Sequence, residues 1–405
     1  MKPLHLSLRF VIVLLFLLAA VIPAEAKESR AYQTGFQMWR AADGGFGDWT
    51  LSGVQRITGS LELDPESFMP GIDPYPAGSY YEHNFYNGDS FFVGEAISPE
   101  TPAAFSFTEA IPSWNAETPE GTWIEVLIRA DLSGRWTKWY NLGVWASDYS
   151  TIERHSVRLQ GDSDGYVSID TLVLTDSKVI ASGYQVKVRL FSENGVSTPV
   201  VRMISVATST TPPKKAGEVS TPVLDGRILD VPECSQMVYP DGGNVWCSPT
   251  STSMVLGFWG IDPGDCAPRV HAAVAGVYDW SFNGHGNWPF NTAYAASRGL
   301  EGYVARLTSL AEAEHWIEAG VPLVASIAWG KKELSGAPID SSNGHLVVIA
   351  GFDARGNPVV NDPAAAFDED VQRTYLRSEF EAVWLKASGG TVYLIYPIGH
   401  NVPES

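Results

Sequence analysis

Apolar and polar residues alternate along the first half of the chain in a pattern that is typical of β-strands. Apolar side chains recur at every second position over residues 122–129 and 184–190, and residues 166–174, which follow the turn-forming stretch 162–165, are a third candidate strand. A period of two places one face of a strand in a core. No convincing helical pattern separates these segments. We therefore expect residues 27–207 to form an all-β sandwich of the jelly-roll type.

The second half shows a mixed pattern. It begins after residues 208–226, which contain Thr-Pro-Pro-Lys-Lys and little that a core would bury, so we predict an extended linker there. Farther on, residues 310–319 have the spacing of a short amphipathic helix. Residues 227–405 should therefore form an α+β domain, with further strands predicted at 322–329, 345–352, 358–361 and 393–396.

Cys247 carries the most informative chemistry of this second domain. Ser248, Pro249 and Thr250 follow it and indicate the start of a helix, because proline is tolerated in the first helical turn. The apolar run 254–259 predicts that this helix is buried. A thiol at a helix N-terminus loses its proton more readily, since the helix dipole stabilises the thiolate. Cys247 is therefore a candidate nucleophile.

A base and an orienting acid follow downstream of this thiol. His345 opens a predicted strand and Asp362 follows the next one, so both side chains can lie at the same end of adjacent strands. Histidine has an ordinary pKa near neutrality, and a carboxylate on its other nitrogen fixes the tautomer. Asn361 competes with Asp362 for the orienting role. Each residue alone also fits an ordinary structural position, but the three in this order favour catalysis.

Four motifs between residues 231 and 397 together resemble a known family. They are SQ at 235–236, WCSPTS at 246–251, GHLVVIAGF at 344–352 and NDP at 361–363. This region resembles the secreted branch of the bacteriocin-processing cysteine peptidases, which are papain-like in fold. Trp246 and Ser248 stand where the transporter-linked members carry an aspartate and a glycine, and the insertion 239–243 lengthens the distance from Gln236 to Cys247. These differences, in a chain without a transporter segment, argue against double-glycine leader cleavage.

The resemblance implies a mechanism and a set of site residues. Cys247 would be the nucleophile, His345 the general base and acid, and Asp362 the residue that orients the imidazole. Gln236 would donate to the oxyanion beside the backbone N–H of Cys247. The implied protein is a cysteine peptidase of the thiol protease type that hydrolyses peptide bonds through a thioester and needs no cofactor or metal. An amidase or transferase that forms the same thioester is an alternative.

Residues 1–26 have the pattern of a signal peptide. A basic start with Lys2 and Arg9 precedes the apolar run 10–18, and Ala-Glu-Ala ends the segment at residue 26. We therefore expect a mature chain that starts near Lys27 and is secreted, with no membrane anchor. In an oxidising compartment thiols tend to pair. A Cys234–Cys266 disulfide would leave Cys247 free, while the two other pairings stay open.

The charge of the chain excludes some partners. Removal of residues 1–26 leaves 25 basic and 45 acidic residues, a net charge of −20. Phosphate recognition needs the opposite sign, so we expect no nucleic-acid partner and no binding to anionic membranes. No His or Cys residues occur at the spacing of zinc ligands. An EF-hand that begins at Asp162 would have Val173 at its twelfth position, so that form of calcium site fails and a turn is the better interpretation.

Aromatic residues crowd one part of the predicted sandwich. Such rings either fill a core or form a platform for sugars, which gives a rival hypothesis of an extracellular glycan-binding or adhesion protein with a catalytically silent second domain. The remaining histidines are weaker candidates: His315 is expected on the surface, and His285 in a mobile loop or on the wall of a substrate cleft. The aromatic residues concerned are Trp114, Trp123, Trp136, Trp139, Tyr140 and Trp145.

Overall fold

Two antiparallel β-sheets form the N-terminal part of the protein. The computed structural model describes residues 31–147, 149–175, 180–215, 217–262 and 264–403, so the predicted signal segment 1–26 lies outside the described residues. The first sheet has the order β11 (Gly165–Ser168), β12 (Thr171–Leu174), β8 (Glu109–Glu117), β14 (Val200–Ser209), β4 (Ser60–Leu63) and β3 (Val54–Ile57), with β1 (Thr34–Arg40) on β14. The second has the order β10 (Tyr140–Trp145), β9 (Thr122–Asp131), β13 (Ala181–Ser192), β6 (Ser90–Ile97) and β2 (Thr50–Ser52), with β5 (Met69–Ile72) on β6 and β7 (Thr101–Phe107) on β13.

The alternation read from the sequence sets the register of the second sheet. Strands β9 and β13 pair with each other, and their predicted apolar faces coincide because Ile124 lies opposite Leu190 and Val126 opposite Val188. All four side chains are fully buried. A slip of one residue would move both faces out of the core, so burial fixes this pairing.

One predicted strand is wrong in its extent. Residues 166–174 do not form a continuous strand: the chain turns back after Ser168, which pairs with Thr171 across the hairpin of β11 and β12. Ile169 and Asp170 form the turn, and Ile169 has a φ of +61°. The turn contains no glycine, proline or asparagine, and therefore the local sequence gave no clear sign of it. An apolar β-branched residue is an unusual choice for a left-handed position.

Most of the crowded aromatic rings belong to the core. Trp114, Trp123, Tyr140 and Trp145 are fully buried. Trp136 and Trp139 are half-buried, and each stacks on the guanidinium of Arg129, at 4.5 and 4.7 Å from the ring centres. The first four rings therefore stabilise the sheets by burial rather than forming a surface platform.

The C-terminal part is a third antiparallel sheet with helices, as the α+β prediction requires. The chain reaches it through residues 210–226, which contain no helix or strand among their described members; β14 takes in the first two residues of the predicted linker. The sheet order is β16 (Leu300–Arg306), β21 (Thr391–Pro397), β17 (Leu323–Trp329), β18 (Ser342–Phe352), β19 (Pro358–Asn361) and β20 (Gln372–Thr374), with β15 (Arg227–Ile228) on β18. The helices are α1 (Cys247–Phe258), α2 (Cys266–Val277), α3 (Trp288–Ser297), α4 (Leu310–Glu318) and α5 (Arg377–Ser388).

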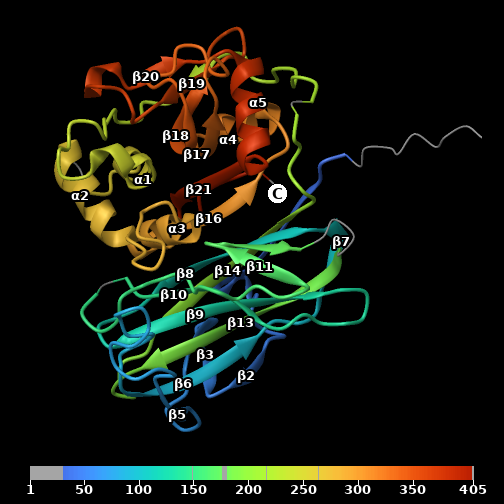
Figure 1. Ribbon diagram of the computed structural model, residues 1–405, viewed down its shortest axis with the longest axis vertical. Coiled ribbons are helices and arrows are strands. Elements are labelled where there is room, and N and C mark those ends of the chain that lie inside the picture. Colours follow the sequence, from blue (N-terminus) through green and yellow to red (C-terminus); the bar gives the residue numbers. More distant parts are fainter. Residues whose placement is uncertain (1–30, 148, 176–179, 216, 263, 404–405) are drawn as a thin grey trace, which may run out of the picture. The chain divides into compact units, whose positions relative to one another are not determined.

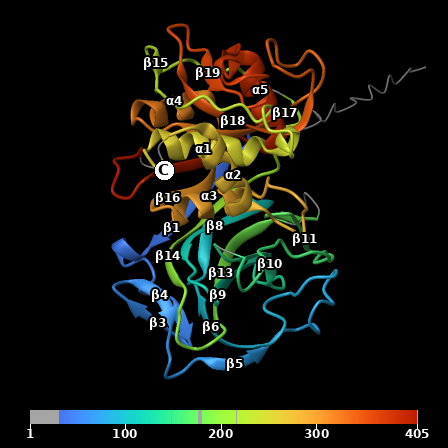
Figure 2. The same cartoon turned by 90° about the vertical axis from the view of Figure 1, so that its left-hand side faces the viewer.

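The chain from Tyr32 onward is one compact unit, and the first sheet packs directly on the third. Asn115 of β8 makes two hydrogen bonds with the backbone of Gly302 in β16. The Asn115 Nδ2 donates to the Gly302 carbonyl at 2.6 Å, and the Asn115 Oδ1 accepts from the Gly302 N–H at 3.3 Å. Phe290 of α3 lies between the rings of Trp114 and Trp145, with ring centres 6.1 and 5.3 Å away. Both views show α3 beside β8 and β16 (Figures 1 and 2). The hydrophobic core therefore continues across the junction.

Hydrogen bonds to one buried ion pair hold the connecting segment on the C-terminal helices. Glu314 of α4 is fully buried against Arg377 of α5, with Oε1 and Nη1 2.6 Å apart. The second oxygen of Glu314 accepts from the backbone N–H of Val223 at 2.5 Å, and the Arg377 Nε donates to the Ser220 carbonyl at 2.7 Å.

Among the described residues, no helix has the length and apolar character that a bilayer crossing requires.

A disulfide ties the start of α2 to the strand-free segment before α1. It joins Cys234 and Cys266, leaving Cys247 as a free thiol; all three cysteines lie in the described residues. Of the three pairings that the sequence allowed, the structure has this one. A crosslink over 32 residues removes chain entropy from the unfolded state.

The double variant Cys234→Ala/Cys266→Ala should lower the free energy of unfolding by about 3–4 kcal/mol, because the unfolded chain regains that entropy. Urea unfolding measures the change. Thiol titration of the unfolded, unreduced wild-type protein is the accompanying control and should find a single free thiol. Three reactive thiols would contradict the pairing.

Candidate active site

Cys247 opens helix α1, which the local sequence starts at this point. The short 3-10 helix Gly243–Val245 leads into it, and Pro249 occupies the first turn, where its missing N–H costs nothing. Met254, Val255 and Leu256 are fully buried and hold the helix in the core. The half-buried Cys247 therefore lies at the positive end of the helix dipole, as the sequence predicted.

His345 and Asp362 come together at neighbouring strands of the third sheet. His345 lies on β18 and Asp362 directly follows β19, and these two strands are paired. The His345 Nε2 and the Asp362 Oδ1 are 2.7 Å apart, and both side chains are buried. Since Nε2 is engaged with the carboxylate, Nδ1 is the ring nitrogen left for the thiol of Cys247.

Further donors satisfy the buried carboxylate. The Asp362 Oδ2 accepts from the Tyr375 hydroxyl at 2.7 Å, and Oδ1 also accepts from the Ala364 backbone N–H at 3.0 Å. Helix α1 is joined to the same strand, because the Ser251 hydroxyl donates to the Leu346 carbonyl at 3.0 Å. This bond fixes the thiol-bearing helix beside the residue that follows His345.

The electrostatics favour a charged pair of Cys247 and His345. Burial raises the pKa of the Cys247 thiol. His345 and the backbone N–H groups of Leu346 and Ser248 lower it by more than burial raises it, so the pKa is below its ordinary value. Burial lowers the pKa of His345, whereas Asp362 and Cys247 raise it to about 10. Burial also raises the pKa of Asp362, but His345, Tyr375 and Ala364 bring it below its ordinary value. Together these interactions shift the pair from the neutral thiol and imidazole toward the thiolate and the imidazolium.

Cys247 and His345 share a cavity of about 760 Å³. Its walls come from the segment before α1, the loop between α2 and α3, strands β17 and β18, and the turn between β11 and β12. A cavity of this size has room for several residues of an extended peptide. Gln236 and His285 line it as well.

Two family models match the chain. The model of the Peptidase_C39 like family matches residues 228–392, and that of the Peptidase C39 N-terminal domain matches residues 35–209. The C-terminal region, residues 228–392, belongs to the peptidase C39-like family. The family predicted from the four motifs is thus confirmed. A comparison with the curated proteins gave no match.

Three solved structures match less than half of the chain each. A C39-like peptidase structure from Bacillus anthracis is 20% identical and covers 42% of this chain and 98% of that one, with a TM-score of 0.31. The CBM22-1–GH10 modules of a Clostridium thermocellum xylanase are 8% identical and cover 43% of this chain and 28% of that one, with a TM-score of 0.20. A carbohydrate-binding module of the β-sandwich superfamily is 9% identical and covers 42% and 58%, with a TM-score of 0.17.

Gln236 of the C39-like domain is buried at the edge of the cavity. Its Nε2 donates one hydrogen to the Gly243 carbonyl at 2.7 Å, and its buried Oε1 has no partner. The amide carries a second hydrogen on Nε2. Asn361 lies elsewhere, since its Nδ2 donates to the carbonyls of Val231 and Pro232 at 3.0 and 3.2 Å. Asp362 is the residue that contacts the imidazole.

Of the weaker sequence candidates, only His285 lines the cavity around Cys247. His285 lines the wall, as its sharper interpretation held, and burial lowers its pKa to about 4. His315 is exposed on α4. Asp162 forms a turn, accepting from the backbone N–H groups of Asp164 and Gly165 at 2.9 and 3.1 Å. In the described ranges, no three His, Cys, Asp or Glu side chains are grouped as metal ligands would be.

Two features of the site could not be predicted from the sequence. Tyr375 follows β20 with nothing in its local pattern to connect it with Asp362. The turn of Ile169 and Asp170 lies within what reads as one strand, far from the C39-like domain in sequence. Only the fold brings either of them to the catalytic residues.

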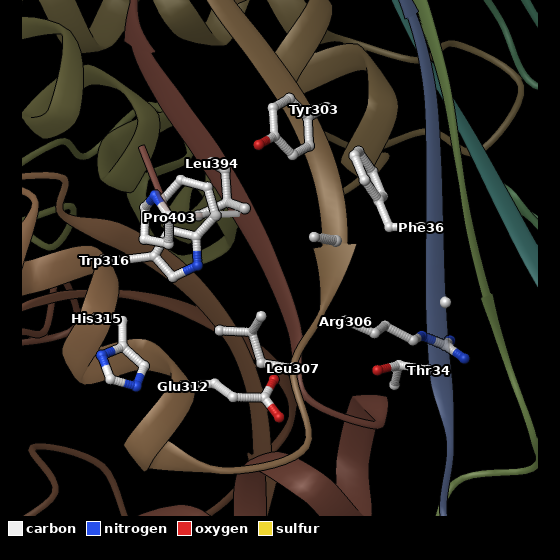
Figure 3. A pocket seen from close by; sticks show the side chains of 12 residues that line it. Thr34, Phe36, Tyr303, Arg306, Leu307, Glu312, His315, Trp316, Leu394 and Pro403 are labelled. Atoms are coloured by element: carbon white, nitrogen blue, oxygen red, sulfur yellow. The ribbon is translucent and has the colours of Figure 1, made fainter. Parts of the chain in front are cut away.

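A second cavity has a volume of about 440 Å³ and is not lined by Cys247. Figure 3 shows side chains that line it. Its walls come from β1, β16 and α4, with Phe36, Tyr303 and Trp316 as its aromatic rings. The guanidinium of Arg306 beside it is already paired, because its Nη1 is 2.6 Å from Glu109 Oε2. No thiol lines this cavity, and we do not assign chemistry to it.

Tyr375→Phe should destabilise the protein by about 1–3 kcal/mol, because the buried Asp362 carboxylate loses one of its donors. The pKa of Asp362 is below its ordinary value in the folded state, so its contribution to stability is present above the unfolded pKa and lost as pH falls through the folded one. With the donor gone, acid unfolding should begin at a higher pH.

Urea unfolding over a range of acidic pH values measures both effects. Tyr166→Phe, at an exposed tyrosine, is the matched control and should change stability by less than about 0.5 kcal/mol. Equal behaviour of the two variants would show that the hydroxyl of Tyr375 does not stabilise the carboxylate.

Proposed function

We propose that this protein is a secreted cysteine peptidase that cleaves peptide bonds through a Cys247-His345-Asp362 triad. Membership in the C39-like family implies a peptidase that acts on a peptide substrate. The observation that carries the proposal is the hydrogen bond of 2.7 Å between the His345 Nε2 and the buried Asp362, beside a free thiol in a large cavity. Nucleophile, base and orienting acid are then all present in one site.

The proposed reaction begins with the thiolate of Cys247, which attacks the carbonyl carbon of the substrate. The tetrahedral intermediate collapses when His345 donates its Nδ1 proton to the leaving amine, and the C–N bond breaks to leave a thioester on Cys247. Water then gives a proton to His345 and attacks the thioester, which releases the acid and restores the thiolate. Asp362 keeps the imidazole in the required orientation throughout.

Two donors are proposed for the developing oxyanion. They are the backbone N–H of Cys247 at the start of α1 and the second Nε2 hydrogen of Gln236. A helix N-terminus presents its free N–H groups to negative charge. Each donor of this kind typically contributes about 3 kcal/mol to transition-state stabilisation. The bond from Gln236 to the Gly243 carbonyl holds the amide at the cavity wall.

The proposed peptidase has two domains and a signal peptide. We infer that the C-terminal domain is papain-like and spans residues 227–405, and that the N-terminal sheets form a jelly-roll sandwich over residues 27–207, with a linker at 208–226. Residues 1–26 would be removed as a signal peptide. The Cys234–Cys266 disulfide supports an oxidising, extracellular location.

The rival adhesion or glycan-binding hypothesis predicts a paired or unreactive Cys247 and an exposed aromatic face. The free thiol with a lowered pKa supports the peptidase instead. Four of the six aromatic rings named for sugar binding are fully buried. An amidase or transferase would use the same thioester, so hydrolysis of peptides has to be measured directly.

Iodoacetamide should alkylate Cys247 of the unreduced protein rapidly at about pH 6, because the thiolate forms below the ordinary thiol pKa of about 8.5. His345→Ala should slow this labelling at least tenfold and abolish peptide hydrolysis. The exposed His315→Ala is the control and should change neither rate. Labelling that rises only near the ordinary thiol pKa in the wild-type protein would refute the proposed peptidase.

Asp362→Asn should narrow the pH range of activity from its alkaline side. The wild-type activity rises with pH as Cys247 ionises and falls as His345 loses its proton near its pKa of about 10. Removal of the carboxylate charge lowers the pKa of His345 toward its ordinary value of about 6.5, so the alkaline decline should begin at lower pH. The pH dependence of kcat/KM tests this, and an unmoved alkaline limb would show that Asp362 does not support the imidazolium.

A further inference from the structure

The cavity around Cys247 is not built by the C39-like domain alone. Four consecutive residues of the N-terminal part, from Ser168 to Thr171, line it together with Cys247 and His345. They are the ends of β11 and β12 and the turn between them. A residue distant in sequence is therefore in a position to contact whatever occupies the cavity.

Asp170 anchors this turn to the C39-like domain. Its buried carboxylate accepts from the backbone N–H of Trp288, the first residue of α3, at 2.7 Å. The other oxygen accepts from the Thr171 hydroxyl at 3.0 Å. Trp288 itself lines the cavity. The bond to the helix N-terminus thus fixes the turn at the cavity wall.

Ile169, at the tip of the turn, has a strained backbone. Its φ of +61° is in the left-handed region, and the Asp170 N–H donates to the Ser168 carbonyl at 2.7 Å across it. A β-branched side chain disfavours this conformation, for which glycine or asparagine is the usual choice. Such strain persists only where the surroundings hold it, and it is concentrated at functional sites.

A loop of the C39-like domain that lines the cavity is also held by the N-terminal part. The loop between α2 and α3 lines the cavity at residues 282–286. Within it, the Asp279 Oδ1 accepts from the Ser156 backbone N–H at 3.1 Å, and the Trp280 Nε1 donates to the Glu153 carbonyl at 3.2 Å. The N-terminal part therefore supplies the turn and also positions this loop.

The lining is poor in charge. Its ionisable side chains are the thiol of Cys247, two histidines and the anchored carboxylate of Asp170, and no lysine, arginine or glutamate is among the described residues that line it. A charged substrate side chain would lose its hydration there without gaining a partner. The apolar side chain of Ile169 lies on this wall and is half-buried.

We propose that Ile169 is a specificity-determining residue, which limits the size of an uncharged substrate side chain near the scissile bond. The inference rests on the proposed peptidase function, since it assigns the cavity to a peptide substrate. It makes the N-terminal sheets part of the substrate site of the C39-like domain. The substrate class is then a peptide segment with uncharged side chains of restricted size.

Tripeptidyl acyloxymethyl ketones, which alkylate an active thiolate, provide the test on the full mature chain. Each position of the peptide is varied in turn between alanine and phenylalanine, and the rate of Cys247 labelling is measured. Ile169→Gly and Ile169→Ala should raise the phenylalanine-to-alanine rate ratio at one position by about tenfold, because the wall is lowered. Leu159→Gly is the matched control: Leu159 has a φ of +56°, is 90% exposed and does not line the cavity.

Iodoacetamide carries no peptide, so its rate of reaction with Cys247 reports the thiolate alone. This rate distinguishes a failure of the proposed role of Ile169 from a failure of the proposed peptidase function. The iodoacetamide rate should match the wild-type rate in at least one Ile169 variant. The phenylalanine-to-alanine rate ratio is then measured with that variant. Ratios unchanged at every position with a reactive thiolate would overturn the role of Ile169, as would loss of iodoacetamide reactivity in both variants. A wild-type protein whose thiol is unreactive near neutral pH would instead remove the peptidase function itself.

Discussion

The carboxylate of Asp362 is removed from water completely, and a buried charge of this kind costs several kcal/mol unless partners compensate it. The Tyr375 hydroxyl and the Ala364 backbone N–H supply two hydrogen bonds, and the imidazole of His345 supplies the third together with a positive charge. The buried carboxylate is stabilised by a protonated His345, and the protonated His345 in turn stabilises a thiolate on Cys247. The reactivity proposed for the thiol therefore depends on where Asp362 is buried.

The fold meets this requirement with a few rigid connections. Pairing of β18 with β19 brings His345 and Asp362 together, and the bond from Ser251 to Leu346 fixes α1 against the same strand. Beyond the C39-like domain, the N-terminal sheets share its core and reach the cavity through the turn at Ile169. The two matched families thus describe parts that form one structural unit rather than a peptidase with an independent module.

Much of this arrangement is predictable from local sequence patterns. The helix start around Cys247, the alternation in β9 and β13, the strand that carries His345 and the strand that ends just before Asp362 are short-range signals, and the structure has each of them. Long-range features are not predictable in this way. Tyr375 reaches Asp362 only through tertiary packing, and the turn at Ile169 is stabilised by an anchor on α3, more than a hundred residues away. The local sequence of β11 and β12 even pointed to a single strand, because no glycine, proline or asparagine marks the turn between them and distant contacts support its strained backbone.

The most direct test of the account is the ultraviolet absorbance of the thiolate as a function of pH, taken as the difference between the wild-type protein and Cys247→Ser. The account predicts a thiolate that is already present at neutral pH and disappears only on acidification, because His345 and Asp362 hold the negative charge on sulfur. A single titration near the ordinary thiol pKa of about 8.5 would contradict it, since Cys247 would then be a buried thiol without an ion-pair partner.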